Sequence, residues 1–211
     1  MNNRLNIYSD ENTLQTVALT DTFTLERYTQ FARYLASDKI QILDVGCADG
    51  RGGARLKHLM PQISLAGLDC VVERLNALPP EYASKVHGLT NSIPANGLSY
   101  DAIVAGEFLE HLYPADVDAT LCEFHRILKI GGQLLMTTPN PYSLKMRLRQ
   151  DTVYGVSHLT QHFPKLLKLR LMMHGFNHVR LIGSGKATRY FGERCPWLSV
   201  YGSYLIIASK I

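Results

Sequence analysis

The sequence contains no run of about 18 apolar residues, the length that a membrane-spanning helix needs. Its first ten residues, Met1 to Asp10, are polar and lack the apolar core of a secretory signal peptide, so we expect a cytoplasmic protein. Internal repeats, low-complexity tracts and long linkers are also absent. The 211 residues therefore fit one globular domain better than two.

Cysteines are few and scattered along the chain. Cys47, Cys70, Cys122 and Cys195 form no CxxC pair. This spacing argues against both a zinc knuckle and a disulfide framework. We expect four reduced thiols in or near the core.

Charge is distributed unevenly, although the formal net charge is only +4. Residues 1–140 carry 11 Lys and Arg against 16 Asp and Glu, a balance of −5. Residues 141–200 carry 10 against 2, a balance of +8. A basic later part either faces an anionic group, such as a phosphorylated sugar, nucleotide, nucleic acid or lipid head group, or forms a solvated basic face.

Apolar periodicity predicts strands that alternate with helices. Helices are expected over 24–36, 51–60 and 164–174, and after Pro114, where Val117, Leu121, Phe124 and Leu128 form one stripe that Gly131-Gly132 stops. Strands are expected over 40–45, 64–70, 86–89, 100–105, 133–138, 178–182 and 204–209. The alternation predicts an α/β fold with a doubly wound, mostly parallel seven-stranded sheet. The last two strands are joined by loop alone, which favours an antiparallel edge hairpin.

A glycine-rich turn with an acidic residue follows the first predicted strand. Gly46 and Gly50 let the backbone turn sharply and approach a ligand, and Asp44 places a carboxylate in the crevice where such sheets bind ligands. A dinucleotide fingerprint needs glycines at 46, 48 and 51, but Ala48 and Arg51 stand at the last two positions. A nicotinamide-dependent dehydrogenase is therefore disfavoured.

A second acid, Asp69, ends the second predicted strand. A carboxylate at that place can accept both hydroxyls of a ribose. Together with Asp44 it predicts a nucleoside that carries a cationic appendage. S-adenosylmethionine, an adenosine joined to a sulfonium and an amino-acid tail, has this chemistry.

Four motifs, at 43–50, 67–69, 100–104 and 128–134, resemble in order and spacing those of the class I S-adenosylmethionine-dependent methyltransferases. The resemblance covers residues 38 to 140 and implies a Rossmann-like methyltransferase fold with S-adenosylmethionine as cofactor. Ala48 stands where the family usually has a third glycine. The residues that the resemblance places around the cofactor are Asp44, Gly46, Cys47, Ala48, Gly50, Asp69, Cys70, Val71, Asn91, Ser92, Ile93, Glu107 and Phe108.

The resemblance also implies an organisation for the whole chain. We expect one methyltransferase domain over 1–211. Its parts are an N-terminal helical segment (1–37), a cofactor-binding core (38–140), a basic helical insertion on the acceptor side (141–177) and two C-terminal antiparallel strands (178–211).

The string Glu107-x-x-Glu110-His111 resembles that of quinone-biosynthesis O-methyltransferases and of small-RNA 2′-O-methyltransferases. In some of those, the equivalent residues bind a divalent metal with a later histidine, for which His158 and His162 are the candidates here. The same string is structural in many relatives, so we assign no metal site. We expect His111 to act as a base or substrate anchor, with His158 as the second catalytic candidate.

The acceptor segment is predicted after the fifth strand, where basic residues could hold a phosphate or carboxylate. They are Lys145, Arg147, Arg149, Lys165, Lys168 and Arg170. The leading hypothesis is O-methylation of a small-molecule, glycan or lipid-linked acceptor. An RNA 2′-O-methyltransferase is the first alternative, although no RNA-binding module is visible. A non-catalytic S-adenosylmethionine-binding partner protein is the second.

Overall fold

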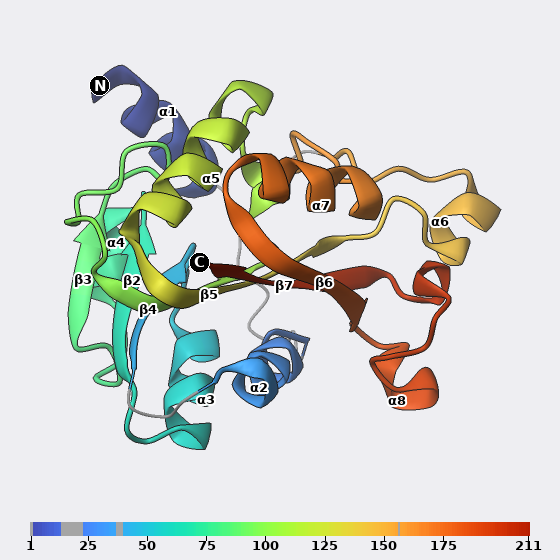
Figure 1. Ribbon diagram of the computed structural model, residues 1–211. Helices are drawn as coiled ribbons and strands as arrows, with labels where there is room; N and C mark the ends of the chain where they lie inside the picture. The colour runs from blue at the N-terminus through green and yellow to red at the C-terminus, as the bar shows by residue number, and fades with distance from the viewer. Residues whose placement is uncertain (1, 14–22, 37–39, 156) are drawn as a thin grey trace.

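The computed structural model describes residues 2–13, 23–36, 40–155 and 157–211, and its central element is a seven-stranded sheet (Figure 1). The strands are β1 (Gln41–Val45), β2 (Ser64–Asp69), β3 (Ser84–His87), β4 (Tyr100–Gly106), β5 (Leu128–Pro139), β6 (Phe176–Ser184) and β7 (Ser203–Lys210). Their order across the sheet is β3-β2-β1-β4-β5-β7-β6, and β7 runs antiparallel to both of its neighbours. The predicted doubly wound, mostly parallel fold with an antiparallel edge is confirmed.

Helices cover both faces of this sheet. They are α1 (Asn2–Thr13), α2 (Phe23–Tyr34), α3 (Arg51–Leu59), α4 (Val72–Asn76), α5 (Pro114–Ile127), α6 (Leu144–Arg149), α7 (Pro164–Met173) and α8 (Thr188–Phe191). Helices α5 and α7 lie over one face, and α2 and α3 lie under the other (Figure 1). Within the described chain, every helix is too short or too polar to cross a bilayer.

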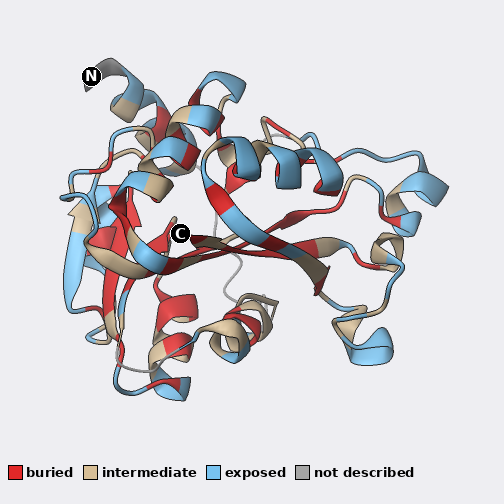
Figure 2. Ribbon diagram, viewed as in Figure 1, coloured by how far each residue is buried: buried red, intermediate tan, exposed pale blue. Residues whose placement is uncertain are grey.

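The side chains of β1 alternate between the two faces of the sheet. Leu43 and Val45 belong to the apolar cluster on the α5–α7 side, whereas Ile42 packs with Phe31 of α2 on the opposite side. Because both faces are covered, the whole strand beyond its first residue is buried (Figure 2). Asp44 has the same parity as Ile42 and therefore points toward α2 and α3.

The boundary between α5 and β5 differs from the prediction. Helix α5 ends at Ile127, because Leu128 already pairs with Tyr100 of β4 as the first residue of β5. The pairing then resumes at Gln133, and Gly131 adopts a φ of +79° within the bulge between them. The glycines therefore shape a strand irregularity instead of stopping a helix.

Other elements follow the expected order with shifted ends. Strand β3 begins two residues before the predicted 86–89, and α8 carries no periodic signal that predicts it. The four cysteines are free thiols, as expected, but Cys122 is exposed whereas Cys47 is buried.

Two glycines let α3 approach two tyrosines. A Cβ on Gly52 would lie closer than 3.0 Å to the ring of Tyr28, and a Cβ on Gly53 would lie equally close to the hydroxyl of Tyr82. Real Cβ atoms do not approach that closely, so these positions accept only glycine without movement of the rings.

We expect Gly53→Ala to lower the free energy of unfolding by about 1–3 kcal/mol, because the new methyl overpacks against Tyr82. Helix propensity alone predicts the opposite, a gain of about 1 kcal/mol. Gly202→Ala is the matched control, since a Cβ there meets open space, and it should stay within about 0.5 kcal/mol of wild type. Urea unfolding measures both, and an unchanged or more stable Gly53→Ala would contradict the packing.

Candidate functional site

A cavity of about 220 Å³ opens at the carboxyl ends of β1, β2 and β4. Ligands in open α/β sheets bind at this edge. Its lining residues come from the turn after β1, the ends of β2 and β4, segment 88–91, α1 and the start of α5. They are Tyr8, Asn12, Gly46, Ala48, Leu68, Asp69, Cys70, Arg74, Gly88, Leu89, Thr90, Asn91, Gly106, Glu107, Phe108, His111, Leu112 and Asp116.

The predicted cofactor residues divide between this lining and the layer behind it. Those that line the cavity are Gly46, Ala48, Asp69, Cys70, Asn91, Glu107 and Phe108, together with the predicted catalytic residue His111. Those that do not are Asp44, Cys47, Gly50, Val71, Ser92 and Ile93. Of this second group all but Ser92 are buried, so they shape the cavity from behind.

Asp69 holds the glycine-rich turn in place. Its Oδ2 accepts a hydrogen bond from the Ala48 amide (3.1 Å), its Oδ1 accepts one from the Val71 amide (2.9 Å), and the Arg74 guanidinium lies 3.9 Å away. Ala48 has a φ of +48°, a left-handed conformation that costs a non-glycine residue roughly 1–2 kcal/mol. The bond to Asp69 offsets part of that strain, so alanine serves where the family usually has glycine.

Asp44 does not line the cavity. Its carboxyl is fully buried on the α2–α3 side, where Oδ1 accepts a hydrogen bond from the Tyr28 hydroxyl (2.5 Å) and Oδ2 accepts one from the Tyr82 hydroxyl. Burial, assisted by the charge of Asp69, raises the pKa of Asp44 to about 7 despite these two bonds. Asp44 therefore supports the turn from behind, because strand parity turns it away from the ligand side.

Asp116 also lines the cavity, although it was not predicted as a site residue from the sequence. It is buried and accepts hydrogen bonds from the Tyr8 hydroxyl and the Asn91 amide, both at 2.8 Å, and Arg4 lies 3.0 Å from it. The Tyr8 hydroxyl in turn accepts a bond from the Tyr113 amide. An acid in the first turn of a helix has an ordinary explanation in the helix dipole, so the sequence did not single it out.

Glu107 borders both this cavity and a larger one of about 1410 Å³, which lies between α2 and the segment that joins β6 to β7. Its φ is +52°, and its amide bonds the Thr137 carbonyl at 3.1 Å. Its carboxylate lies 3.8 Å from the Arg27 guanidinium and accepts a bond from the Ser203 hydroxyl at 3.3 Å. Strained non-glycine residues often mark functional sites, and Ala48 and Glu107 both line the small cavity.

Glu110, His111 and His158 form a cluster beside the cavity. Each offers an oxygen or nitrogen atom, and these atoms all lie within 4.8 Å of one another. The Nδ1 of His111 lies 2.8 Å from the Ser157 carbonyl, and the Nδ1 of His158 lies 3.0 Å from the Val153 carbonyl. A carbonyl only accepts, so each Nδ1 carries the proton and each Nε2 keeps a lone pair.

The electrostatics of the cluster suit a ligand with positive charge. Burial and the charge of Glu107 raise the pKa of Glu110 well above its usual range, and burial and His158 lower the pKa of His111 to about 4. Glu110 accepts one bond from the Thr138 hydroxyl, but its Oε1 is buried without a partner among the described residues. One carboxyl oxygen of Glu110 and two imidazole nitrogens that lie within 4.8 Å of one another form a donor set for a divalent cation, whose binding would displace the Glu110 proton.

The other candidate histidine lies outside this cluster. His162 is buried, and its Nε2 is paired with the Thr160 hydroxyl at 2.9 Å. Its Nε2 is therefore satisfied within the protein, away from Glu110, His111 and His158.

The predicted anion-binding residues are placed differently from the expectation. Of the six basic side chains in 145–170, only Lys145 lines the large cavity. Lys165 and Lys168 are exposed on α7, and Arg170 is paired with Asp118 at 2.6 Å. The other cations of the cavity come from α2, α3 and the β6–β7 connection.

The pKa of Asp44 predicts a pH-dependent stability. The group titrates near pH 3.8 in an unfolded chain and near 7 in the folded protein, so the folded state retains the proton and loses relative stability as the pH rises between these values. We expect the free energy of unfolding of the wild type, relative to Asp44→Asn, to fall by up to about 1.4 kcal/mol per pH unit in this window and to level off above it. Urea titrations across the window test this, and a difference that is independent of pH would contradict it.

Comparison with known proteins finds similarity to methyltransferases. Residues 43–134 match the family model described as a methyltransferase domain. The mitochondrial ubiquinone biosynthesis O-methyltransferase of Mus musculus is 30% identical over 121 residues, which cover 52% of this chain and 31% of that protein. Malonyl-[acyl-carrier protein] O-methyltransferase 1 of Coxiella burnetii is 26% identical over 139 residues, which cover 66% and 48% respectively. The chain thus spans 31% of the length of the first of these relatives and 48% of the second.

Solved structures agree on the fold. A SAM dependent methyltransferase from Archaeoglobus fulgidus superposes with a TM-score of 0.68 at 20% identity, covering 89% of this chain and 94% of the other. The resemblance predicted from the sequence is confirmed by the matched segment, the relatives and the fold together. Residues 43–134 of this chain are thus similar to methyltransferase domains, and the chain has the fold of the S-adenosylmethionine-dependent methyltransferases.

Proposed function

We propose that this protein transfers the methyl group of S-adenosylmethionine to an oxygen atom of a small acceptor. The observation that carries the proposal is the meeting of two cavities at Glu107, which gives a donor site and an acceptor site one shared wall. Both relatives described above are O-methyltransferases, which supports oxygen as the accepting atom.

The small cavity fits the cofactor by charge. Its lining carries three carboxylates, Asp69, Glu107 and Asp116, against one guanidinium, that of Arg74. Arg4 and Arg27 approach Asp116 and Glu107 from outside the lining. The groups that face the cavity are nevertheless mainly acidic, which favours a sulfonium and an ammonium group over a pyrophosphate. Asp69 would accept the ribose hydroxyls, and the amide of Asn91 would face the adenine.

The chain must position the acceptor and remove its proton. When bound, S-adenosylmethionine supplies an activated methyl group, which leaves an uncharged thioether once oxygen has taken it. His111 lines the cofactor cavity, and its Nε2 lone pair is the proton acceptor that the transfer from a hydroxyl needs. The Ser157 carbonyl fixes the tautomer that keeps this lone pair available.

As an alternative to His111 acting as the base, we propose that Glu110, His111 and His158 bind a divalent cation, which would occupy the free lone pair of His111. The sequence alone assigns no metal here, but two imidazole nitrogens and one carboxylate oxygen suit zinc or manganese better than magnesium. A cation at this place would lower the pKa of an acceptor hydroxyl.

Asp69→Ala should weaken binding of S-adenosylhomocysteine by about 1–3 kcal/mol, because it deletes a charged acceptor and frees the Ala48 amide. Calorimetry measures the affinity. Asp118→Ala removes an exposed carboxylate of similar size away from the cavity and should leave the affinity unchanged. Equal affinity of Asp69→Ala and wild type would remove Asp69 from the site.

The metal assignment predicts that the protein, dialysed against Zn²⁺ or Mn²⁺, retains about one ion per chain, measured by mass spectrometry of the metal. His158→Ala and Glu110→Gln should lose the ion, whereas His58→Ala, at an exposed position of α3, should retain it. A wild type that retains no ion would overturn the metal site and leave His111 as the base.

A further inference from the structure

The larger cavity carries a concentration of positive charge. It lies between α2 and residues 185–202, which connect β6 to β7. Three of its cations come from α2 and α3, namely Arg27, Arg33 and Arg55. Lys145, Lys186, Arg189 and Arg194 contribute the rest.

Only part of this charge is neutralised by the cavity itself. Its three carboxylates each lie beside one arginine, in the pairs Glu193–Arg33, Glu26–Arg189 and Glu107–Arg27. Among the described residues, no carboxylate pairs with the remaining four cations, which are Arg55, Lys145, Lys186 and Arg194. The cavity therefore holds four more cations than anions.

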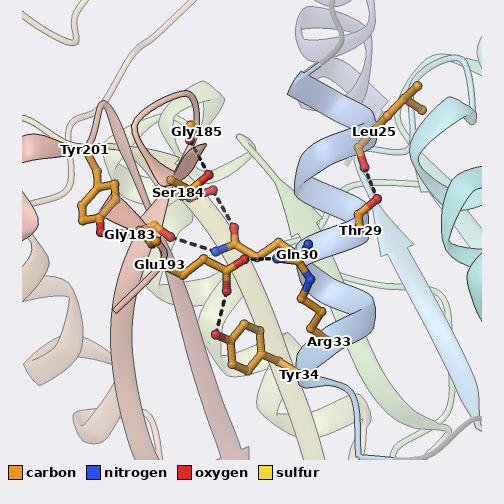
Figure 3. Close-up of polar contacts among 12 residues, drawn as sticks. Leu25, Thr29, Gln30, Arg33, Tyr34, Gly183, Ser184, Gly185, Glu193 and Tyr201 are labelled. Atoms are coloured by element: carbon orange, nitrogen blue, oxygen red, sulfur yellow. Dashed lines mark hydrogen bonds and ion pairs between the residues drawn. The ribbon is translucent and has the colours of Figure 1, made fainter. Parts of the chain in front are cut away.

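Polar contacts, of which those of Gln30 are buried, join α2 to the end of β6 and to Glu193 in the segment that follows it (Figure 3). The amide of Gln30 donates to the Gly183 carbonyl and accepts from the Ser184 hydroxyl, both at 2.8 Å. The Glu193 carboxylate accepts from the Tyr34 hydroxyl at 2.7 Å and from Arg33. Because these contacts already order the cationic wall of the cavity, a ligand can bind without the entropic cost of ordering it.

We propose that the acceptor is a small phosphate or diphosphate ester and that its phosphate group binds in this cavity. The inference rests on the proposed function and names the acceptor class for that same reaction. A single carboxylate would leave most of the excess charge unmatched, and a neutral glycan would leave all of it, whereas a diphosphate carries two to three negative charges. Guanidinium groups also match phosphate oxygens in geometry.

The placement of the cavity favours a small ester over a nucleic acid. The excess cations converge on one cavity that shares Glu107 with the cofactor site, so a bound ester has access to the methyl donor. The exposed cations of α7, Lys165 and Lys168, line neither cavity. An RNA-binding surface needs a continuous basic stripe outside the cavity.

Calorimetry with inorganic diphosphate at low salt tests the proposal. We expect the triple variant Arg55→Gln/Lys145→Gln/Arg194→Gln to bind diphosphate about tenfold more weakly or worse. The control variant Arg147→Gln/Lys165→Gln/Lys168→Gln removes the same charge outside the cavity and should match wild type. S-adenosylhomocysteine should bind all three proteins equally, which separates this test from that of the cofactor site and shows that the variants fold.

Two competition arms identify the source of the phosphate. Displacement of diphosphate by a nucleoside diphosphate indicates a soluble ester, and displacement only by vesicles containing phosphatidic acid indicates a lipid-linked one. Either result supports the proposal.

Three results would contradict the proposal that a phosphate group binds in the large cavity. The proposal is overturned if wild type does not bind diphosphate, or if the triple variant binds it as well as wild type does. It is also overturned if single-stranded RNA binds more tightly than diphosphate and the control variant weakens that binding. If the wild-type protein does not bind S-adenosylhomocysteine, the proposed function is overturned instead.

Discussion

The site depends on one buried carboxyl group that two tyrosine hydroxyls share. Asp44 is the last residue but one of β1, next to the glycine-rich turn. Tyr28 reaches it from α2, and Tyr82 reaches it from the segment between α4 and β3. A carboxyl left in that position without donors would pay the full cost of desolvation. The two hydrogen bonds therefore tie the glycine-rich turn to elements on the opposite face of the sheet from the cavity. The glycines of α3 make room for the two tyrosine rings.

Features that depend on neighbouring residues in the sequence, such as the strands and the glycine-rich turn, were predictable. Buried apolar runs and glycine turns identified the strands, their parallel arrangement and the turn that lines the cavity, because these depend on residues near one another in the chain. Leu128 lies at helical spacing from Phe124, yet pairing with β4 draws it into a strand, so tertiary contact overrides periodicity. Asp44 was placed on the wrong side of its strand because a strand buried on both faces shows no alternation of polarity.

The remainder of the site is assembled from distant segments. Tyr8 and Asp116 are 108 residues apart, and His158 joins Glu110 and His111 only through the fold. Charge counts identified a basic segment at residues 141–200, but Arg27 and Arg55 of the large cavity belong to the acidic first part. Composition gives the amount of charge, and only topology gives its place.

The position of Glu107 between two cavities has a thermodynamic consequence. Arg27 and Ser203 contact its carboxylate and also line the large cavity. A ligand that draws either of them away changes the charge presented to the cofactor. Linkage then requires reciprocity, so that the cofactor alters the affinity for that ligand by the same factor. With the donor and the acceptor in the two cavities as proposed, Glu107 would couple their binding energies without any movement of a domain.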